Sequence, residues 1–151
     1  MKNNKVLWFV GAAIILVLAL FIVPKLKGTA NTYNGSLDCL LPNLQLALHW
    51  HPTLKILVDG QSESIPSNLG LIGDCHFPLH THDSSGAIHV EAQVVRDYTL
   101  GEFMEVWGQP LQRDGYTLEM TVDGQPNTDF GNLVLKDKQE IVLNYSKITS
   151  N

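Results

Sequence analysis

The feature that most constrains this chain is an apolar run near its N-terminus, VLWFVGAAIILVLALFIV at residues 6–23. These 18 residues include no charged or strongly polar side chain. At about 1.5 Å per residue, a helix of this length comes close to spanning a hydrocarbon core of about 30 Å. We therefore expect residues 1–27 to form an N-terminal transmembrane helix that serves as an uncleaved signal anchor.

The alternative for this run is a cleaved signal peptide, because Gly28, Thr29 and Ala30 offer small residues for cleavage. However, the run is long for such a peptide, and two lysines separate it from these residues. Residues 28–36 are rich in Gly, Thr and Asn and predict a linker. Residues 37–151 then form one domain. We expect a single-pass membrane protein whose C-terminal domain is extracytoplasmic, in the periplasm or at the cell surface.

Periodic patterns predict the elements of this domain. Alternating and β-branched residues predict strands at residues 44–48, 53–58, 88–95, 118–122 and 140–145. Thr99 and Glu102 have the spacing of a capping box, ahead of a short amphipathic helix that ends near Gly108. We therefore expect an α+β fold, in which a small, mostly antiparallel or mixed sheet packs against one helix in a β-grasp-like arrangement.

Charge limits the classes of partner. The chain carries a formal net charge of −5, and its acidic residues all lie C-terminal to residue 27. No basic stripe with interleaved aromatic residues is present in the sequence, so we expect no nucleic-acid partner. The expected partners are the membrane, through residues 6–23, and a membrane-protein complex in which the anchor helix packs against other helices.

The chain has two cysteines, Cys39 and Cys75. In an oxidising compartment a lone pair favours a disulfide. Such a bond would close a loop of about 36 residues and contribute about 3–4 kcal/mol. The competing interpretation is a metal thiolate at Cys75, which is adjacent to His76.

The uneven placement of histidine is the main functional signal, because all six histidines lie between residues 49 and 89. Two His-x-His pairs and one His-x-Glu pair occur there, and residues i and i+2 of a strand point to the same face. Imidazole and carboxylate groups that converge from neighbouring strands suit copper or zinc. The predicted metal ligands are His49, His51, His80, His82, His89 and Glu91.

Other interpretations of these histidines remain open. A single His-x-His pair is common in strands and is more often structural than a ligand pair. His49 and His89 lie on the more polar faces of their strands, so a site there would be shallow or covered by residues 74–86. We expect a carrier, sensor or accessory subunit. The alternatives are a small metal-dependent hydrolase-like enzyme, with Glu91 or Asp83 as general base, and a non-metal interaction subunit of a membrane complex. Because no HExxH or GxSxG motif is present, binding is favoured over catalysis.

The segment LHTHDSSGAIHVE at residues 79–91, with the upstream HWH at residues 49–51, gives the pattern HxH…LHTHDxxGxIHxE. This pattern resembles an uncharacterised family of prokaryotic membrane-anchored or secreted proteins, over about residues 37–145. Members of that family carry a cysteine upstream of the first histidine pair, as Cys39 does here. The resemblance therefore implies a Cys39–Cys75 pair and a shared fold and site, but it implies no reaction.

Overall fold

The computed structural model describes residues 38–43 and 45–149, which lie in the unit Tyr33–Asn151. The predicted anchor, residues 1–27, and the predicted linker, residues 28–36, lie outside the described residues. Within the described ranges, no helix is long and apolar enough to cross a membrane. The described fold is mixed α+β and is built mostly from strands, with one α-helix among these residues.

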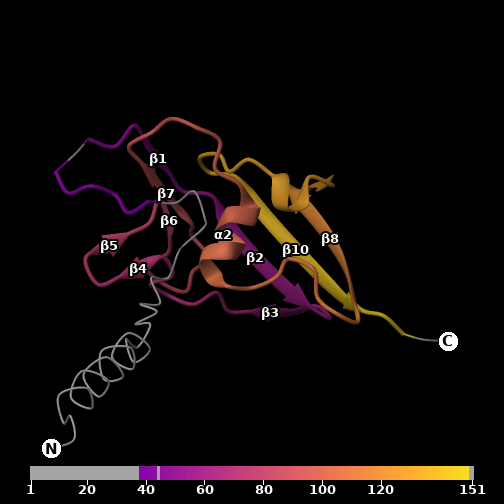
Figure 1. Ribbon diagram of the computed structural model, residues 1–151. Coiled ribbons are helices and arrows are strands. Elements are labelled where there is room, and N and C mark those ends of the chain that lie inside the picture. Colours follow the sequence, from indigo (N-terminus) through magenta and orange to yellow (C-terminus); the bar gives the residue numbers. More distant parts are fainter. Residues whose placement is uncertain (1–37, 44, 150–151) are drawn as a thin grey trace, which may run out of the picture. The chain divides into compact units, whose positions relative to one another are not determined.

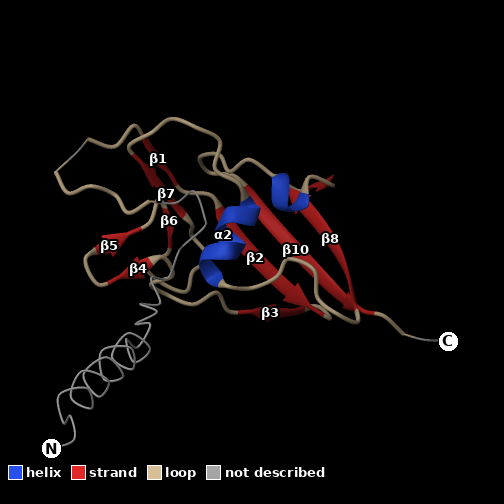
Figure 2. Ribbon diagram, in the orientation of Figure 1, coloured by secondary structure: helices blue, strands red, loops and turns tan. Residues whose placement is uncertain are grey.

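The larger sheet has five strands in the order β3-β2-β10-β8-β9 (Figures 1 and 2). Its central pair, β2 and β10, is parallel, whereas its other pairs are antiparallel. Parallel neighbours need a long connection, and here that connection carries the helix and all the remaining strands except β1. The bounds are β2 Thr53–Val58, β3 Gln61–Glu63, β8 Tyr116–Val122, β9 Gln125–Asn127 and β10 Glu140–Lys147.

Helix α2, Leu100–Trp107, begins at the predicted capping box. The Thr99 hydroxyl accepts a hydrogen bond from the Glu102 N–H, and the Glu102 carboxylate accepts one from the Thr99 N–H at 2.8 Å. These two bonds satisfy backbone donors that the first turn of a helix leaves free. The helix ends at Gly108, and a short 3-10 helix, η1 (Phe130–Asn132), follows later in the chain.

Two smaller sheets complete the described fold. Three strands pair antiparallel in the order β1-β7-β6, and the hairpin β4-β5 lies just before β6 in the chain (Figure 1). The bounds are β1 Leu48–Trp50, β4 Leu71–Ile72, β5 Cys75–His76, β6 Leu79–His80 and β7 His89–Ala92.

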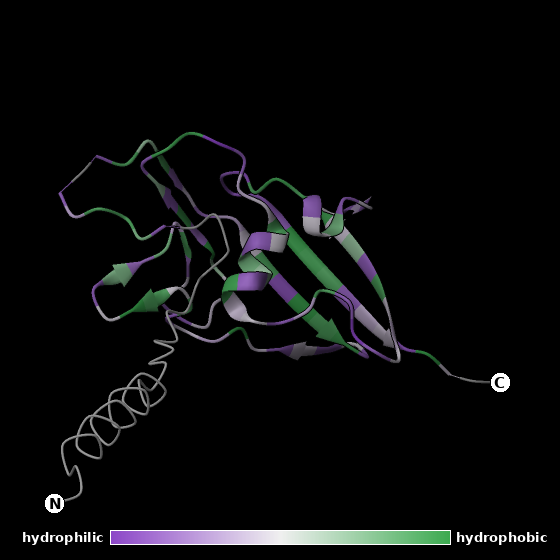
Figure 3. Ribbon diagram, viewed as in Figure 1, coloured by the Kyte–Doolittle hydropathy of each residue, from purple (hydrophilic) through white to green (hydrophobic). Residues whose placement is uncertain are grey.

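A single apolar core joins the five-stranded sheet, the β1-β7-β6 sheet and α2. In β10, Ile141 and Leu143 are buried, and Figure 3 shows the apolar stretches of β2 and β10 in green. Val90 of β7 belongs to the same core and is fully buried. Burying such a side chain contributes about 1.5–3 kcal/mol, so the core fixes which face of β7 turns inward. His89 and Glu91, on either side of Val90, must therefore lie on the opposite face.

The predicted strands at residues 53–58, 118–122 and 140–145 and the predicted helix are confirmed. The strand predicted at residues 44–48 is wrong, because β1 begins only at Leu48. The strand predicted at residues 88–95 is also shorter, since β7 ends at Ala92. The two errors have one cause. Beyond Ala92 the ladder stops, and the Gln93 side chain instead exchanges hydrogen bonds with the backbone of Leu41.

Cys39 and Cys75 form a disulfide, with their Cα atoms 5.2 Å apart. The predicted bond is confirmed, and the alternative of a Cys75 thiolate ligand is excluded, because the sulfur is already bonded. A backbone hydrogen bond from the Leu40 N–H to the His76 carbonyl continues this connection at 2.8 Å. The disulfide thus ties the start of the described chain to the β4-β5 hairpin.

Candidate metal centre

The register of the β1-β7-β6 sheet brings the histidine pairs together. His49 of β1 lies directly opposite Glu91 of β7, and His80 of β6 lies directly opposite His89. Directly opposite residues have Cβ atoms about 4.5–5.5 Å apart and share a face. The His-x-His partners at i+2, His51 and His82, extend the same face at the ends of β1 and β6.

All five predicted histidine ligands lie in one continuous cluster. The ring centroid of His89 is 4.6 Å from that of His51, 4.4 Å from that of His82 and 5.2 Å from that of His80. The His49 ring continues the row, with its centroid 4.7 Å from that of His51. The convergence on which the metal prediction depends is therefore present.

Glu91 supplies the carboxylate of this cluster. Its Oε1 atom lies 3.3 Å from His49 Nε2 and 3.3 Å from His89 Nδ1. Its Oε2 atom lies 4.0 Å from His80 Nε2. The carboxylate therefore faces imidazoles from all three strands of the sheet.

His80 is oriented in the way that a metal ligand is usually oriented. Its Nδ1 lies 2.8 Å from the Phe77 carbonyl oxygen, which can only accept, so Nδ1 carries the proton. The lone pair is then on Nε2, which points into the cluster and lies 3.3 Å from His82 Nε2. Metal-binding histidines characteristically donate the other ring N–H to a carbonyl or carboxylate in this way.

Burial changes along the cluster. The side chain of His49 is 58% exposed, those of His89 and Glu91 are about one-fifth exposed, and that of His80 is 1% exposed. The segment just before the β4-β5 hairpin packs closely on β6, because a Cβ on Gly70 would lie 3.1 Å from His80 Cβ. Residues 74–86, the expected cover, instead supply two of the clustered histidines, His80 and His82. The cluster therefore has an exposed outer end and a buried inner end.

Thr81 holds residues 66–69 in place beside β6, and sequence reasoning missed this role. The side chain of Thr81 accepts a hydrogen bond from the Leu69 N–H and donates one to the Pro66 carbonyl at 2.9 Å. Thr81 is fully buried between two histidines. A threonine in a polar segment gives no signal of this role, because its partners lie 12 and 15 positions away.

The pKa values of the buried groups favour binding-competent states. Burial lowers the pKa of His80, although the Phe77 carbonyl and the Glu91 carboxylate oppose this shift. Burial also lowers the pKa of His89. Partial burial of Glu91 tends to raise its pKa, but the His89 hydrogen bond and the nearby histidine charges outweigh it, so the pKa is lowered. Neutral imidazole and ionised carboxylate are the forms that bind metal ions.

His76 and Asp83 lie outside both sets of converging donor atoms. The His76 ring centroid is 6.2 Å from that of His80, and His76 belongs to neither set of residues whose donor atoms converge. The Asp83 carboxylate accepts a hydrogen bond from the Ser85 N–H at 2.9 Å, which fixes the turn after His82.

Three donor pairs have the spacing of ligands around one transition-metal ion. For tetrahedral zinc with bonds of about 2.0–2.1 Å, neighbouring ligand atoms are about 3.3 Å apart. The His49–Glu91, His89–Glu91 and His80–His82 donor distances are all 3.3 Å. Two sets of four residues, His49, His51, His89, Glu91 and His80, His82, His89, Glu91, each place their donor atoms within 4.8 Å of one another.

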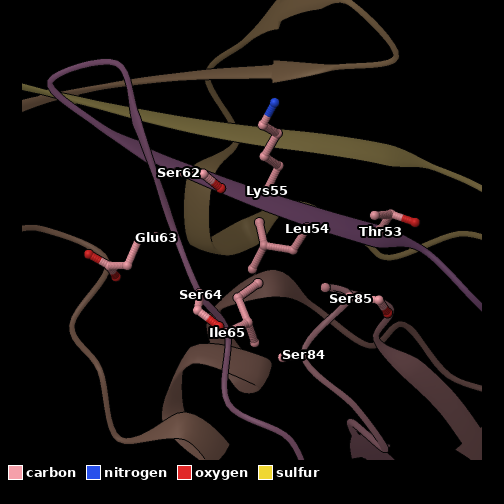
Figure 4. A pocket seen from close by; sticks show the side chains of 10 residues that line it. Thr53, Leu54, Lys55, Ser62, Glu63, Ser64, Ile65, Ser84 and Ser85 are labelled. Atoms are coloured by element: carbon pink, nitrogen blue, oxygen red, sulfur yellow. The ribbon is translucent and has the colours of Figure 1, made fainter.

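An open hollow lies elsewhere in the domain. It has a volume of about 440 Å³ and is lined by β2, β3 and residues 84–86 (Figure 4). Figure 4 shows Leu54 and Ile65 pointing toward each other, while Lys55 extends away from them. None of the predicted metal ligands lines this hollow.

None of the family models, curated proteins or solved structures compared with the chain matches it. The resemblance noted from the HxH…LHTHDxxGxIHxE pattern therefore stays a prediction, and the geometry of the cluster carries the functional argument.

Proposed function

We propose that this domain binds a transition-metal ion, copper or zinc, and acts as a membrane-anchored extracytoplasmic carrier, sensor or accessory subunit. The observation that carries the proposal is the convergence of five histidines and Glu91 on one face of the β1-β7-β6 sheet. Three of their donor pairs have the 3.3 Å separation of a metal coordination shell.

The donor types favour Zn(II) or Cu(II). Imidazole nitrogen suits both ions, and one carboxylate oxygen adds a harder ligand. Soft sulfur ligands, which favour Cu(I), are scarce here. Both cysteines are in the disulfide, and the chain has three methionines, none within the predicted ligand set.

Two contacts favour a binding site over a hydrolytic enzyme. A general base must be able to reach a bound water, but the Glu91 carboxylate is already surrounded by His49, His80 and His89. The Asp83 carboxylate, the other candidate base, is engaged with the backbone of its own turn.

The proposed location and architecture follow from features outside the cluster. A disulfide persists in oxidising compartments, which supports an extracytoplasmic domain behind an anchor at residues 6–23. We propose that the anchor places the domain beside a membrane-protein complex. The five-stranded order with a parallel central pair and one helix supports a β-grasp-like domain. Membership in the prokaryotic family with the HxH…LHTHDxxGxIHxE pattern belongs to the same proposal.

The test is the affinity of the purified full-length protein for Zn(II) and Cu(II), measured by chelator competition in detergent. The decisive variant combines His89→Ala with Glu91→Gln, because both convergent sets use these residues. Loss of a residue that merely orients a ligand weakens affinity about 10–100-fold, so loss of two ligands should weaken it by at least about 100-fold.

His76→Ala is the matched control. It removes an exposed histidine from the same sequence cluster but outside both convergent sets, so wild-type affinity is expected. Circular dichroism of each variant confirms that the fold is retained. If the wild-type protein binds neither ion more tightly than free histidine does, the proposal is wrong.

A further inference from the structure

The six donor residues divide into two overlapping sets rather than one. His49 and His51 belong to the first set, at the exposed end, and His80 and His82 to the second set, at the end that includes buried His80. No set among the described residues contains both histidine pairs. A single ion with four ligands would therefore leave one His-x-His pair unused.

Glu91 and His89 are the residues that the two sets share. The two oxygens of Glu91 lie near different histidines: Oε1 lies 3.3 Å from both His49 Nε2 and His89 Nδ1, and Oε2 lies 4.0 Å from His80 Nε2. His89 lies between the two ends, in ring contact with His51 on one side and His82 on the other. A carboxylate whose oxygens face different ligand groups can bridge two ions, and paired ions in proteins lie about 3.5–4 Å apart.

We propose that the cluster holds two transition-metal ions bridged by the Glu91 carboxylate. This inference rests on the proposed function and extends it. His49 and His51 hold one ion at the exposed end. His80 and His82 hold the other ion at the end that includes buried His80. His89, at the centre, completes the ligand set of one of the two ions, because a neutral imidazole has one lone pair.

Nearby carboxylates support two ions by offsetting their charge. The Asp137 carboxylate accepts a hydrogen bond from the His51 N–H at 3.0 Å, so it lies beside the exposed end. Asp83 follows His82 directly, and its carboxylate interacts electrostatically with His82 and His89 at the other end. Each end thus has its own carboxylate in addition to Glu91, which reduces the repulsion between two divalent ions.

The test is the number of ions bound per chain. The full-length protein is loaded with excess Cu(II) in detergent, freed of unbound ion, and measured by mass spectrometry and electron paramagnetic resonance. We expect two ions in the wild-type protein and in His76→Ala, with a resonance signal reduced by coupling between the two Cu(II) ions.

The ligands at each end of the cluster are then replaced in turn. Only exposed histidines are replaced, so that the fold is preserved. His49→Ala/His51→Ala is expected to retain one ion, and His82→Ala is expected to retain one ion, each with an uncoupled Cu(II) signal. Glu91→Gln keeps the side-chain volume but replaces one carboxylate oxygen with an amide NH2 group that cannot bind a metal ion, so the coupled signal should be lost.

The outcomes separate the two proposals. One ion in the wild-type protein would overturn the two-ion inference and leave the proposed function intact, whereas no bound ion would overturn both. Two ions that persist in both the His49/His51 and His82 variants would place the ions elsewhere and would also overturn the inference.

Discussion

The substitution Gly70→Ala tests the packing that supports His80, at the buried end of the cluster. Gly70 lies just before β4 with φ +72°, in close contact with β6 and α2. A Cβ at this position would overlap the Leu79 carbonyl oxygen and would lie 3.1 Å from His80 Cβ and 3.2 Å from Val106 Cγ1. Gly70→Ala therefore forces apart residue 70 and β6, the strand that carries His80.

The expected loss in the free energy of unfolding of Gly70→Ala has two parts. An L-residue held at positive φ costs about 1–2 kcal/mol. Overpacking against a carbonyl oxygen, which cannot rotate away as a side chain can, costs about 1–3 kcal/mol more. Gly73 is the matched control, because it lies in the turn of the β4-β5 hairpin with φ +57°, and a Cβ added there would meet no atom within 4 Å. Gly73→Ala should therefore cost only the first part.

The assay is thermal unfolding of the metal-free full-length protein, followed by near-ultraviolet circular dichroism. At about 4 °C per kcal/mol for a domain of this size, Gly70→Ala should melt about 4–12 °C below Gly73→Ala. Chelator competition on the same samples should show weaker Zn(II) binding only for Gly70→Ala, because only that change disturbs the packing of β6, which carries His80. Equal melting temperatures in the two variants would refute the close packing of Gly70 against β6.

Two further predictions concern stability. Replacing Cys39 and Cys75 by serine should lower the free energy of unfolding by about 3–4 kcal/mol, measured by urea titration, since the disulfide closes a loop across 36 positions; an unchanged midpoint would contradict this. Without metal, stability should fall as the pH drops through about 6.5, because burial lowers the pKa of His80 and the unfolded chain then binds a proton that the folded chain resists. His80→Gln should make stability less dependent on pH. If the urea midpoint of the wild-type protein does not change between about pH 7.5 and 5.5, this prediction is wrong.

Much of the candidate site could be predicted from the sequence because its signals are local. Residues i and i+2 of a strand share a face, so the His-x-His and His-x-Glu pairs could be assigned before any tertiary contact was known. The helix was predictable for the same reason, since Thr99 and Glu102 complete its capping box within one turn.

The strand ends were predicted wrongly where the neighbouring strand decides how far a strand extends. Residues 44–46 alternate like a strand, yet β1 begins at Leu48 because its partner β7 ends at Ala92. A strand extends only as far as its neighbour offers backbone hydrogen bonds, and no pattern within the strand itself records where the neighbour stops.

Local sequence patterns show which side chains can bind a metal ion and how they pair within each strand. The meeting of the three pairs depends on tertiary contacts, because the register of β1-β7-β6 sets His49 against Glu91 and His80 against His89. Tertiary contacts also bury His80 while His49 remains exposed. The reason is physical: register and burial depend on contacts between residues tens of positions apart, which the shared apolar core fixes, whereas strand periodicity depends on neighbours alone.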